Sequence, residues 1–193
     1  VYKRQLHDFG MRVPMLCLWE GTIKPGSEYD GIVANIDFAP TLLDVCGVTP
    51  PADYAIDGVS FKAQLMGSEQ PVRKALYAEL GHSRGVKTKD WKYIAVRYPE
   101  KVREQIERGE TFIGFDGNEL DLPYLTRNGH LGHHASAVNP HYFEADQLYD
   151  LRRDSEETEN VFARKPEVAQ RMKKELSNVL RSFEERPFGE FTK

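Results

Sequence analysis

The fold is decided by the stretch Arg84-Gly85-Val86-Lys87-Thr88-Lys89-Asp90-Trp91-Lys92-Tyr93-Ile94-Ala95-Val96. Two runs with β-branched and aromatic residues, 84–88 and 92–96, flank a short polar turn, and this pattern is typical of an antiparallel hairpin. The runs 75–79 and 147–151 have the same character. The sequence therefore predicts an antiparallel sheet of four strands.

A helix is expected to cover this sheet. Pro166 suits the first turn of a helix, and apolar residues follow it at three- and four-residue steps, namely Val168, Ala169, Met172, Leu176, Val179, Leu180 and Phe183. Such a stripe predicts a C-terminal helix that faces the core. Between the strands, residues 99–108 alternate charge around two apolar residues, which favours a short solvated helix within an insertion at about 98–145.

The composition is that of an ordinary globular protein, with 193 residues of which 40% are hydrophobic and 29% are charged. A net charge of −4 shows no excess of basic residues that would indicate nucleic-acid binding. No apolar run approaches the length of a membrane span, and no signal peptide is visible. We therefore expect neither nucleic acid nor a membrane as a partner. Cys17 and Cys46 lie in apolar stretches and are expected to be small buried residues.

The first part of the chain is expected to belong to an α/β sheet. The apolar run 15–19 is short enough for a buried strand, and residues 31–34 suit a second short strand. A helix is predicted from Asp37, which suits the N-cap, to Gly47, which suits the left-handed position after a helix end. Its apolar stripe is expected to pack against a sheet and consists of Phe38, Leu42 and Cys46.

A basic pair, Lys3 and Arg4, stands before the run 15–19. Lys3 would lie in the loop that enters the predicted strand, where a cation can clamp an anion. On these residues alone, a solvated basic pair at a frayed terminus is the alternative interpretation.

Six motifs follow one another in a fixed order along the chain. The first three are Lys3-Arg4 with Leu6-His7-Asp8 and Arg12-Val13-Pro14, then Trp19-Glu20-Gly21 with Lys24-Pro25-Gly26, then Asn35-Ile36-Asp37 with Ala39-Pro40-Thr41-Leu42-Leu43-Asp44 and Gly47. The others are Asp57-Gly58-Val59-Ser60-Phe61, then Arg84-Gly85-Val86-Lys87-Thr88 with Trp91-Lys92-Tyr93-Ile94, and Gln147-Leu148-Tyr149-Asp150-Leu151 with Asp154, Glu157 and Asn160. Together they resemble the formylglycine-dependent sulfatases of the alkaline phosphatase superfamily.

The resemblance implies an α/β, alkaline-phosphatase-like fold. Residues 1–70 would be the C-terminal remnant of the catalytic domain, and residues 71–193 a small subdomain with the antiparallel sheet and the C-terminal helix. The parent protein would be a sulfuric ester hydrolase, and Lys3 occupies the place of a lysine that contacts the sulfate oxygens. A positioned ammonium stabilises the charge that develops on these oxygens. Asp8 stands where the family more often has Glu, His7 stands where it often has Tyr, and Arg12 is expected to be structural.

The resemblance also implies cofactors that this sequence has no residues to hold. The family's formylglycine arises from a Cys/Ser-x-Pro-x-Arg motif, and its calcium is held in part by an adjacent pair of Asp residues; the sequence contains neither motif. We therefore expect no metal in this chain and no hydrolysis by the chain alone. Calcium and formylglycine are expected in the missing N-terminal part of the same protein, which makes that part a partner.

Four polar residues of the subdomain are candidates for contacts beyond the sulfate, namely His82, Arg84, His134 and His141. Histidine and arginine can donate to the hydroxyls or to a second acidic group of a sulfated sugar, so a sulfated small molecule or glycan is the expected ligand. For each residue the alternative is an exposed or structurally bonded side chain. The clustered histidines near His134 lack the accompanying cysteines that would indicate zinc, and residues 116–121 fail the calcium-loop pattern.

Two other functions stay open at this level. One is a phosphodiesterase or phosphonate hydrolase of the same superfamily, and the other is a non-catalytic module that binds sulfated glycans. Family resemblance implies a periplasmic or secreted location. Because no flanking strands are evident for the run 15–19, we also expect self-association through exposed apolar edges.

Overall fold

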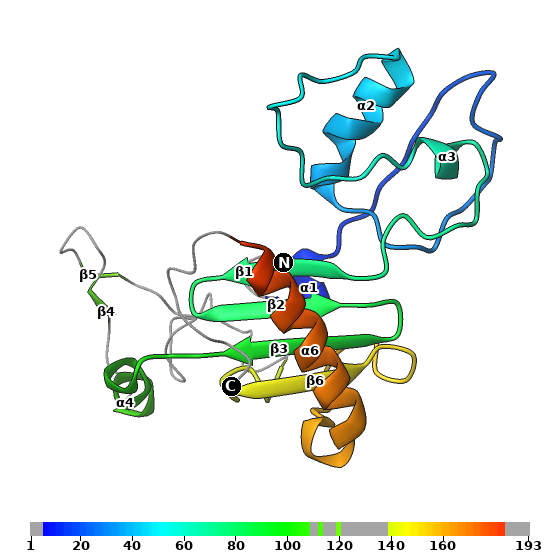
Figure 1. Cartoon of the computed structure of the whole chain (residues 1–193). Coiled ribbons are helices and arrows are strands. Elements are labelled where there is room, and N and C mark those ends of the chain that lie inside the picture. The colour runs from blue at the N-terminus through cyan, green and yellow to red at the C-terminus, as the bar shows by residue number, and fades with distance from the viewer. Residues whose placement is uncertain (1–5, 109–111, 114–118, 121–138, 184–193) are drawn as a thin grey trace. The chain divides into compact units, whose positions relative to one another are not determined.

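The computed structural model describes residues 6–108, 112–113, 119–120 and 139–183 (Figure 1). They form two compact units. The first, called the sheet unit below, contains residues 6–12 together with the described residues after 76, and the second contains residues 13–76. Residues 6–12 thus group with the sheet and not with the segment that follows them.

Four strands form the antiparallel sheet of the sheet unit, in the order β1-β2-β3-β6 (Figure 1). They are β1 (Leu76–Leu80), β2 (Ser83–Lys87), β3 (Trp91–Val96) and β6 (Asp146–Asp150). Each strand begins and ends within one residue of the predicted run, so the predicted sheet is confirmed. The register places Lys87 directly opposite Lys92, and Lys92 directly opposite Tyr149.

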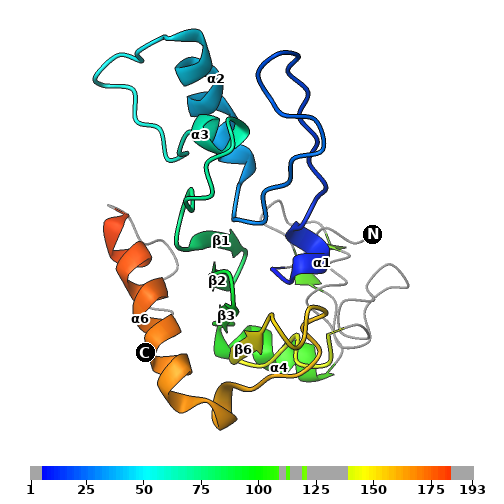
Figure 2. The ribbon, with the colours of Figure 1, turned by 90° about the vertical axis from the view of Figure 1, so that its right-hand side faces the viewer.

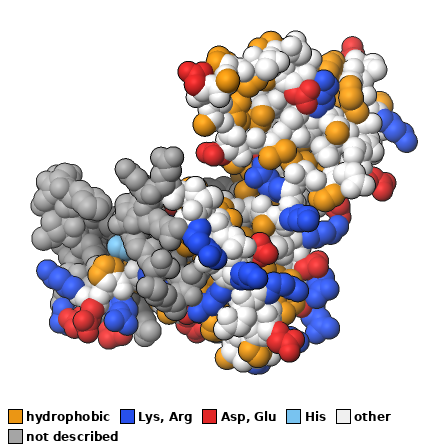
Figure 3. Space-filling view, in the orientation of Figure 1, with side chains coloured by type: hydrophobic (Ala, Val, Ile, Leu, Met, Phe, Trp, Pro, Cys, Tyr) orange, Lys and Arg blue, Asp and Glu red, His pale blue; other side chains and the backbone are white. Residues whose placement is uncertain are grey.

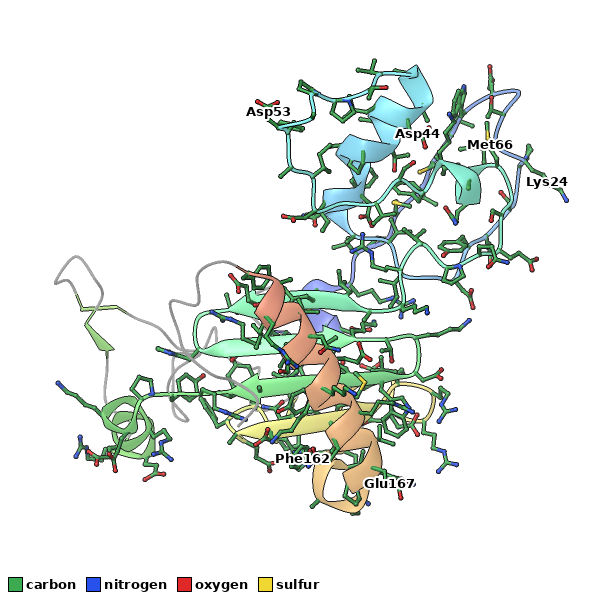
Figure 4. The ribbon with its side chains drawn as sticks, viewed as in Figure 1. Lys24, Asp44, Asp53, Met66, Phe162 and Glu167 are labelled. Atoms are coloured by element: carbon green, nitrogen blue, oxygen red, sulfur yellow. The ribbon has the colours of Figure 1, made fainter. Side chains whose placement is uncertain are left out.

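One face of the sheet is covered by α6 (Pro166–Ser182), which starts at Pro166 as predicted. The helix buries Ala169, Met172 and Leu176 and packs on β2 and β3. Just before it, η3 (Phe162–Arg164) is a turn of 3-10 helix. The ring of Phe162 stacks on that of Tyr93 at a centroid distance of 6.1 Å (Figure 4). The predicted apolar stripe is therefore core at its three buried positions, but its last member, Phe183, follows the helix end and is exposed.

The opposite face of the sheet carries residues 6–12, which include the short helix α1 (Asp8–Met11). Figure 2 shows the sheet edge-on, with α6 on one side and α1 on the other. Leu6 is buried in a cluster with Ile94, Val96 and Tyr149. It packs over Gly85, where a Cβ would lie 3.4 Å from Leu6 Cδ1, in ordinary van der Waals contact. The sheet unit thus has three layers.

Past β3 the chain forms α4 (Glu100–Arg108), which confirms the predicted short helix. A two-stranded antiparallel ribbon follows, made of β4 (Phe112–Ile113) and β5 (Glu119–Leu120). The helix α4 and the ribbon both lie within the predicted insertion at about 98–145. Among the described residues, no helix has both the length and the apolar character needed to cross a membrane.

The unit 13–76 is organised around Asp37, whose side chain is fully buried. The carboxylate accepts the backbone N–H of Ala34 at 2.8 Å and that of Val59 at 2.9 Å, and it pairs with Arg73. Gly58 lets this contact form, since a Cβ there would lie 2.0 Å from the carbonyl oxygen of Ile36. Asp37 therefore joins the Asn-Ile-Asp motif to the Asp-Gly-Val-Ser-Phe motif.

The helices of this unit are η1 (Asn35–Asp37), α2 (Phe38–Cys46) and α3 (Lys62–Leu65). The predicted helix after Asp37 is confirmed, and it ends at Gly47, which has a φ of 67° in the left-handed region. The predicted cap is wrong in one respect. Asp37 occupies the N-cap position, but its side chain bonds none of the free N–H groups of α2.

Several predictions for residues 13–76 are wrong. Residues 15–19 and 31–34 form no strand, because a strand needs a neighbour to pair its backbone groups and no described strand lies beside either run. Leu16 is 97% exposed and Leu18 is 90% exposed. Cys17 and Cys46 are also exposed, as are Phe38 and Leu42 on the stripe of α2. Among the large apolar side chains described in this unit, Phe61 alone is buried.

Candidate functional site on the sheet unit

The predicted sulfate-binding segment enters the described structure at Leu6, since Lys3 lies outside the described residues. The carbonyl oxygen of Leu6 accepts from Lys92 Nζ at 3.1 Å, and its side chain lies in the core. The turn of α1 follows at once and is closed by Arg12, whose N–H donates to Asp8 O at 2.7 Å. The chain is therefore fixed to the sheet from the third residue after Lys3.

A cluster of four charged side chains, called the ion cluster below, fixes Asp8 at the start of α1. The Asp8 carboxylate pairs with Lys92 Nζ at 2.5 Å and also with Lys87. Glu157 completes the cluster, because its Oε1 lies 2.5 Å from Lys92 Nζ and its Oε2 accepts the Asp8 N–H at 2.5 Å. Lys92 and Glu157 are only 2% and 1% exposed. The ion cluster thus balances two cations with two carboxylates.

The two carboxylates respond differently to burial. Burial opposes ionisation of Asp8, but the ammonium groups of Lys92 and Lys87 outweigh it and hold the Asp8 pKa below its usual range. For Glu157, burial dominates over the attraction of Lys92 and raises the pKa. Loss of Lys92 would therefore leave the buried Glu157 carboxylate without its cation, which is more costly than the intact pair is stabilising.

The loop after β6 delivers Glu157 to this position. Asp154 holds the loop by accepting the N–H of Thr158 at 3.0 Å and that of Glu159 at 2.8 Å. Glu157 has a φ of 57°, in the left-handed region that L-residues other than glycine rarely adopt. This conformation costs roughly 1–2 kcal/mol. The hydrogen bonds of Asp154 and the charges around Glu157 hold the residue there.

His7 belongs to a second, neutral network beside the ion cluster. Its Nε2 lies 3.3 Å from the hydroxyl of Tyr149, which donates to Gln147 Oε1 at 2.9 Å. The Tyr149 oxygen is then left to accept from Nε2–H, so Nδ1 carries the lone pair. Burial, with the nearby Lys92 ammonium, lowers the pKa of His7 to about 3. His7 is therefore neutral at physiological pH.

This neutral network also reaches the loop that carries His141. Gln147 Nε2 donates to the carbonyl oxygens of Tyr142 at 3.1 Å and Glu144 at 3.0 Å. The rings of His7 and Tyr142 stack at a centroid distance of 6.0 Å. The loop at 139–145 is thus fixed against the segment that follows Lys3.

The structure places the four candidate substrate residues in different surroundings. His141 is partly exposed, and its Nδ1 lies 2.7 Å from Glu144 Oε1. His82 is half-buried, its ring meets Tyr98 edge-on at 5.5 Å, and burial together with the charge of Arg84 lowers its pKa. His134 lies outside the described residues. His82 is thus brought close to Arg84, and His141 is brought close to His7.

Arg84 is buried and serves the turn between β1 and β2. Its Nη1 donates to the carbonyl oxygens of Gly81 at 2.7 Å and Ser83 at 2.8 Å, and its Nε lies 3.2 Å from Glu79 Oε2. A contact between Arg84 and a substrate stays a prediction. The structure gives the residue a structural role that sequence reasoning had offered as the alternative.

Comparison with known proteins identifies the family. Residues 1–111 match the family model described as N-sulphoglucosamine sulphohydrolase, C-terminal. The chain belongs to this sulfatase family. It is 27% identical over 192 residues to YdeN, an uncharacterized sulfatase of Escherichia coli, and this match covers 94% of the chain and 30% of YdeN. It is 29% identical over 169 residues to an ulvan-active sulfatase of Formosa agariphila, with 82% of the chain and 30% of that protein covered.

The fold is also that of known sulfatases. The structure of BT4656, solved in complex with its substrate D-glucosamine-2-N,6-O-disulfate, matches with a TM-score of 0.51 and 23% identity over 83% of this chain and 26% of that one. The chain therefore has the fold of the C-terminal part of a sulfatase, which confirms the predicted alkaline-phosphatase-like class. It spans less than a third of the length of these relatives.

The sulfatase motifs now have physical roles. Lys87 and Lys92 come from the hairpin motif and Glu157 comes from the last motif, and all three converge on Asp8. Asn160 also comes from the last motif and ties the chain to β6, because its Oδ1 accepts the N–H of Leu148 at 2.9 Å.

Sequence reasoning did not foresee the ion cluster. A usable signal was present, since the predicted hairpin places Lys87 and Lys92 opposite each other on one face. Like charges in such a pair destabilise a sheet unless an anion lies between them.

The described residues of this chain do not fit the sulfatase cofactors. Among the described residues, no three His, Cys, Asp or Glu side chains come together as metal ligands. The two carboxylates that do meet, Asp8 and Glu157, are already neutralised by Lys87 and Lys92. The described part of the chain thus offers calcium no free carboxylate pair, and the sequence has no Cys/Ser-x-Pro-x-Arg motif for a formylglycine.

Proposed function

We propose that this chain is the C-terminal segment of an enzyme that hydrolyses sulfate esters on a sulfated carbohydrate. Within that enzyme it would supply the loop in which Lys3 contacts the sulfate oxygens. The observation that carries the proposal is the family match over residues 1–111, which includes Lys3 and the segment fixed by the ion cluster. Cleavage of the S–O bond builds negative charge on the sulfate oxygens, and an ammonium held near them stabilises that charge.

The carbohydrate part of the proposal is supported by what the relatives act on or bind. One relative is an ulvan-active sulfatase, and the structural neighbour BT4656 was solved with a sulfated glucosamine as its substrate. In this chain, His141 is partly exposed on a loop that packs beside His7. Because its Nδ1 donates to Glu144, the imidazole there can accept from a sugar hydroxyl at Nε2 when it is neutral and can donate to one when it is protonated. His82, Arg84 and His134 complete the set of proposed contacts beyond the sulfate.

The proposal requires a further part of the protein. Calcium and a formylglycine nucleophile are implied for the complete enzyme, and this chain lacks the motifs for both. When bound, these groups would supply electrostatic stabilisation and the attacking oxygen. We infer that the chain alone is inactive and that its partner is the missing N-terminal part of the same protein, in the periplasm or outside the cell.

The exposed apolar side chains of residues 13–76 support such a partner. Of the fifteen large apolar side chains exposed among the described residues, twelve lie in this unit. Figure 3 shows hydrophobic side chains spread over its surface. A unit that buries so little cannot offset its own conformational entropy by burial within itself. It would be stable only against another apolar surface, supplied by the rest of the catalytic domain or, in its absence, by a second copy of the chain.

The proposal is tested by comparing the chain alone with the complete enzyme. An aryl sulfate and a sulfated glucosamine are the substrates, and released sulfate is the measure. We expect no turnover by the chain alone, turnover by the complete enzyme, and loss of most of that turnover in Lys3→Ala. Dose-dependent turnover by the chain alone would contradict the inferred inactivity.

The same assay separates the alternatives. Faster turnover of a phosphodiester or phosphonate than of the sulfate ester would favour the related hydrolases. Specific binding of a sulfated glycan by the isolated chain, without any turnover in the complete protein, would favour a non-catalytic binding module.

A further inference from the structure

We propose that Asp8, Lys92 and Glu157 are positioning residues for sulfate binding, because together they set where the segment that carries Lys3 leaves the sheet. The inference rests on the proposed function and deepens it. These residues are named as motif members above, but the proposed chemistry gives none of them a part.

Lys92 is the centre of the arrangement. Its ammonium has three hydrogens, and three oxygens surround it, namely Leu6 O at 3.1 Å, Asp8 Oδ1 at 2.5 Å and Glu157 Oε1 at 2.5 Å. Two of these oxygens belong to the segment after Lys3, and one belongs to the loop after β6. Through its hydrogen bonds to Leu6 O and Asp8 Oδ1 and its ion pair with Glu157, the side chain fixes the position of the backbone at Leu6 as well as that of the Asp8 carboxylate.

This fixed point is close to Lys3 along the chain. Only Arg4 and Gln5 separate Lys3 from Leu6. A polypeptide spans at most about 3.5 Å per residue, so this short segment reaches at most about 11 Å from Leu6. A shift of the Leu6 carbonyl moves the point from which the segment to Lys3 starts. Misplacement of a catalytic group by about 1 Å can cost on the order of a hundredfold in rate.

Glu157 restricts the same segment from the other side. Its Oε2 accepts the N–H of Asp8, so the backbone before α1 is held at the two peptide groups on either side of His7. Glu157 does this from a left-handed backbone conformation, with a φ of 57°. Strained backbone of this kind persists where the surrounding structure over-determines it and is concentrated at functional sites. Charged hydrogen bonds are directional, which apolar contacts are not, so they suit a positioning role.

The competing interpretation is that the ion cluster only stabilises the sheet unit. The two interpretations differ in how the effects of substitutions combine. If Lys92 acts on the reaction through Lys3, then its removal has no further effect once Lys3 is gone. If Lys92 only stabilises the fold, its removal lowers the concentration of folded enzyme but leaves the rate per folded enzyme unchanged, whether or not Lys3 is present.

The experiment is a double-mutant cycle in the complete sulfatase, with Lys3→Ala, Lys92→Met and the double variant assayed on a small aryl sulfate. Rates are divided by the concentration of folded enzyme from circular dichroism. We expect kcat to fall at least tenfold in Lys92→Met, with KM changed less than threefold. The kcat of the double variant should be no more than threefold lower than that of Lys3→Ala. An unchanged kcat per folded enzyme in Lys92→Met, or a full tenfold further loss in the double variant, would overturn the proposal.

Further variants keep the test decisive if Lys92→Met does not fold. Asp8→Asn keeps the shape of the side chain, removes its charge and should lower kcat in the same non-additive way, whereas Asp8→Glu should restore at least a third of the activity. Lys174→Met is the matched control, because Lys174 is exposed on α6, and it should leave kcat unchanged. If Lys3→Ala itself keeps full activity, the proposed function is wrong. If Lys3→Ala is impaired but its effect on kcat simply multiplies with that of Lys92→Met, only the positioning role is wrong.

Discussion

Replacement of His7 by Phe should change how the stability of the sheet unit depends on pH. Burial and Lys92 lower the pKa of His7 from the ordinary 6.5 to about 3. Below pH 6.5, His7 therefore binds a proton in the unfolded chain, whereas in the folded chain it stays neutral until the pH nears 3. Stability contributed by the neutral imidazole is complete above pH 6.5 and is lost as the pH falls towards 3. Between pH 8 and pH 5 the loss amounts to about 2 kcal/mol, with a slope near pH 5 of about 1.3 kcal/mol per pH unit.

His7→Phe removes this term and keeps a ring of similar size between Tyr142 and Tyr149. At pH 8 the variant should be less stable by about 1 kcal/mol, because the hydrogen bond to the Tyr149 hydroxyl is lost. At pH 5 it should be more stable than the parent by about 1 kcal/mol, since the parent alone has lost about 2 kcal/mol. The order of stabilities therefore reverses between these two pH values.

The assay is urea unfolding at pH 8, 7, 6 and 5, followed by tryptophan fluorescence in a Trp19→Phe background. Trp91, which is buried in β3, then reports on the sheet unit alone. Tyr149→Phe is the matched control, because it removes the same hydrogen bond but keeps the buried imidazole. It should be less stable than the parent at every pH, with the parent's pH dependence. A constant difference between His7→Phe and its parent from pH 8 to pH 5 would refute the reasoning.

Three further predictions concern packing. Gly58→Ala should destabilise the unit 13–76 by roughly 1–3 kcal/mol, because its Cβ would meet the Ile36 carbonyl at 2.0 Å; unchanged hydrogen-exchange protection of that unit would contradict this. Met172→Ala should lower the urea midpoint of the sheet unit by an amount equivalent to about 2–5 kcal/mol without changing the m-value, since Met172 is 1% exposed on the buried face of α6. We expect the isolated chain to self-associate, and the double variant Leu16→Ser, Leu18→Ser should shift it towards monomer in light scattering; an unchanged mass distribution would exclude this run as the contact.

The sheet unit was predictable because its signals are local. Alternation along residues 84–96, a polar turn and a helix opened by Pro166 each act within a few residues, and the strands and α6 appear where these signals place them. The run 15–19 failed for the opposite reason. Its apolar residues are typical of a buried strand, but such a strand is buried only between neighbouring strands. None of the described strands pairs with it.

The candidate site was predictable only in part. The motifs identified the sulfatase resemblance and drew attention to Lys3, but they did not reveal why Lys92 and Glu157 belong to them. Their meeting joins residues far apart in the chain, at positions 8, 92 and 157. A single sequence contains periodicity and turn chemistry, whereas such a long-range contact follows from the register of β2 and β3 and from the loop that Asp154 holds.

The balance of charge in the ion cluster restricts how the protein can change during evolution. With two ammonium groups and two carboxylates enclosed together, a single loss leaves one buried charge uncompensated, so most one-step replacements at Lys92 or Glu157 would be eliminated by selection. Paired replacements that remove one charge of each sign avoid this barrier. Relatives that lack the lysine at position 92 should therefore also lack the acid at position 157, and aligned sequences would reveal the two positions as a correlated pair.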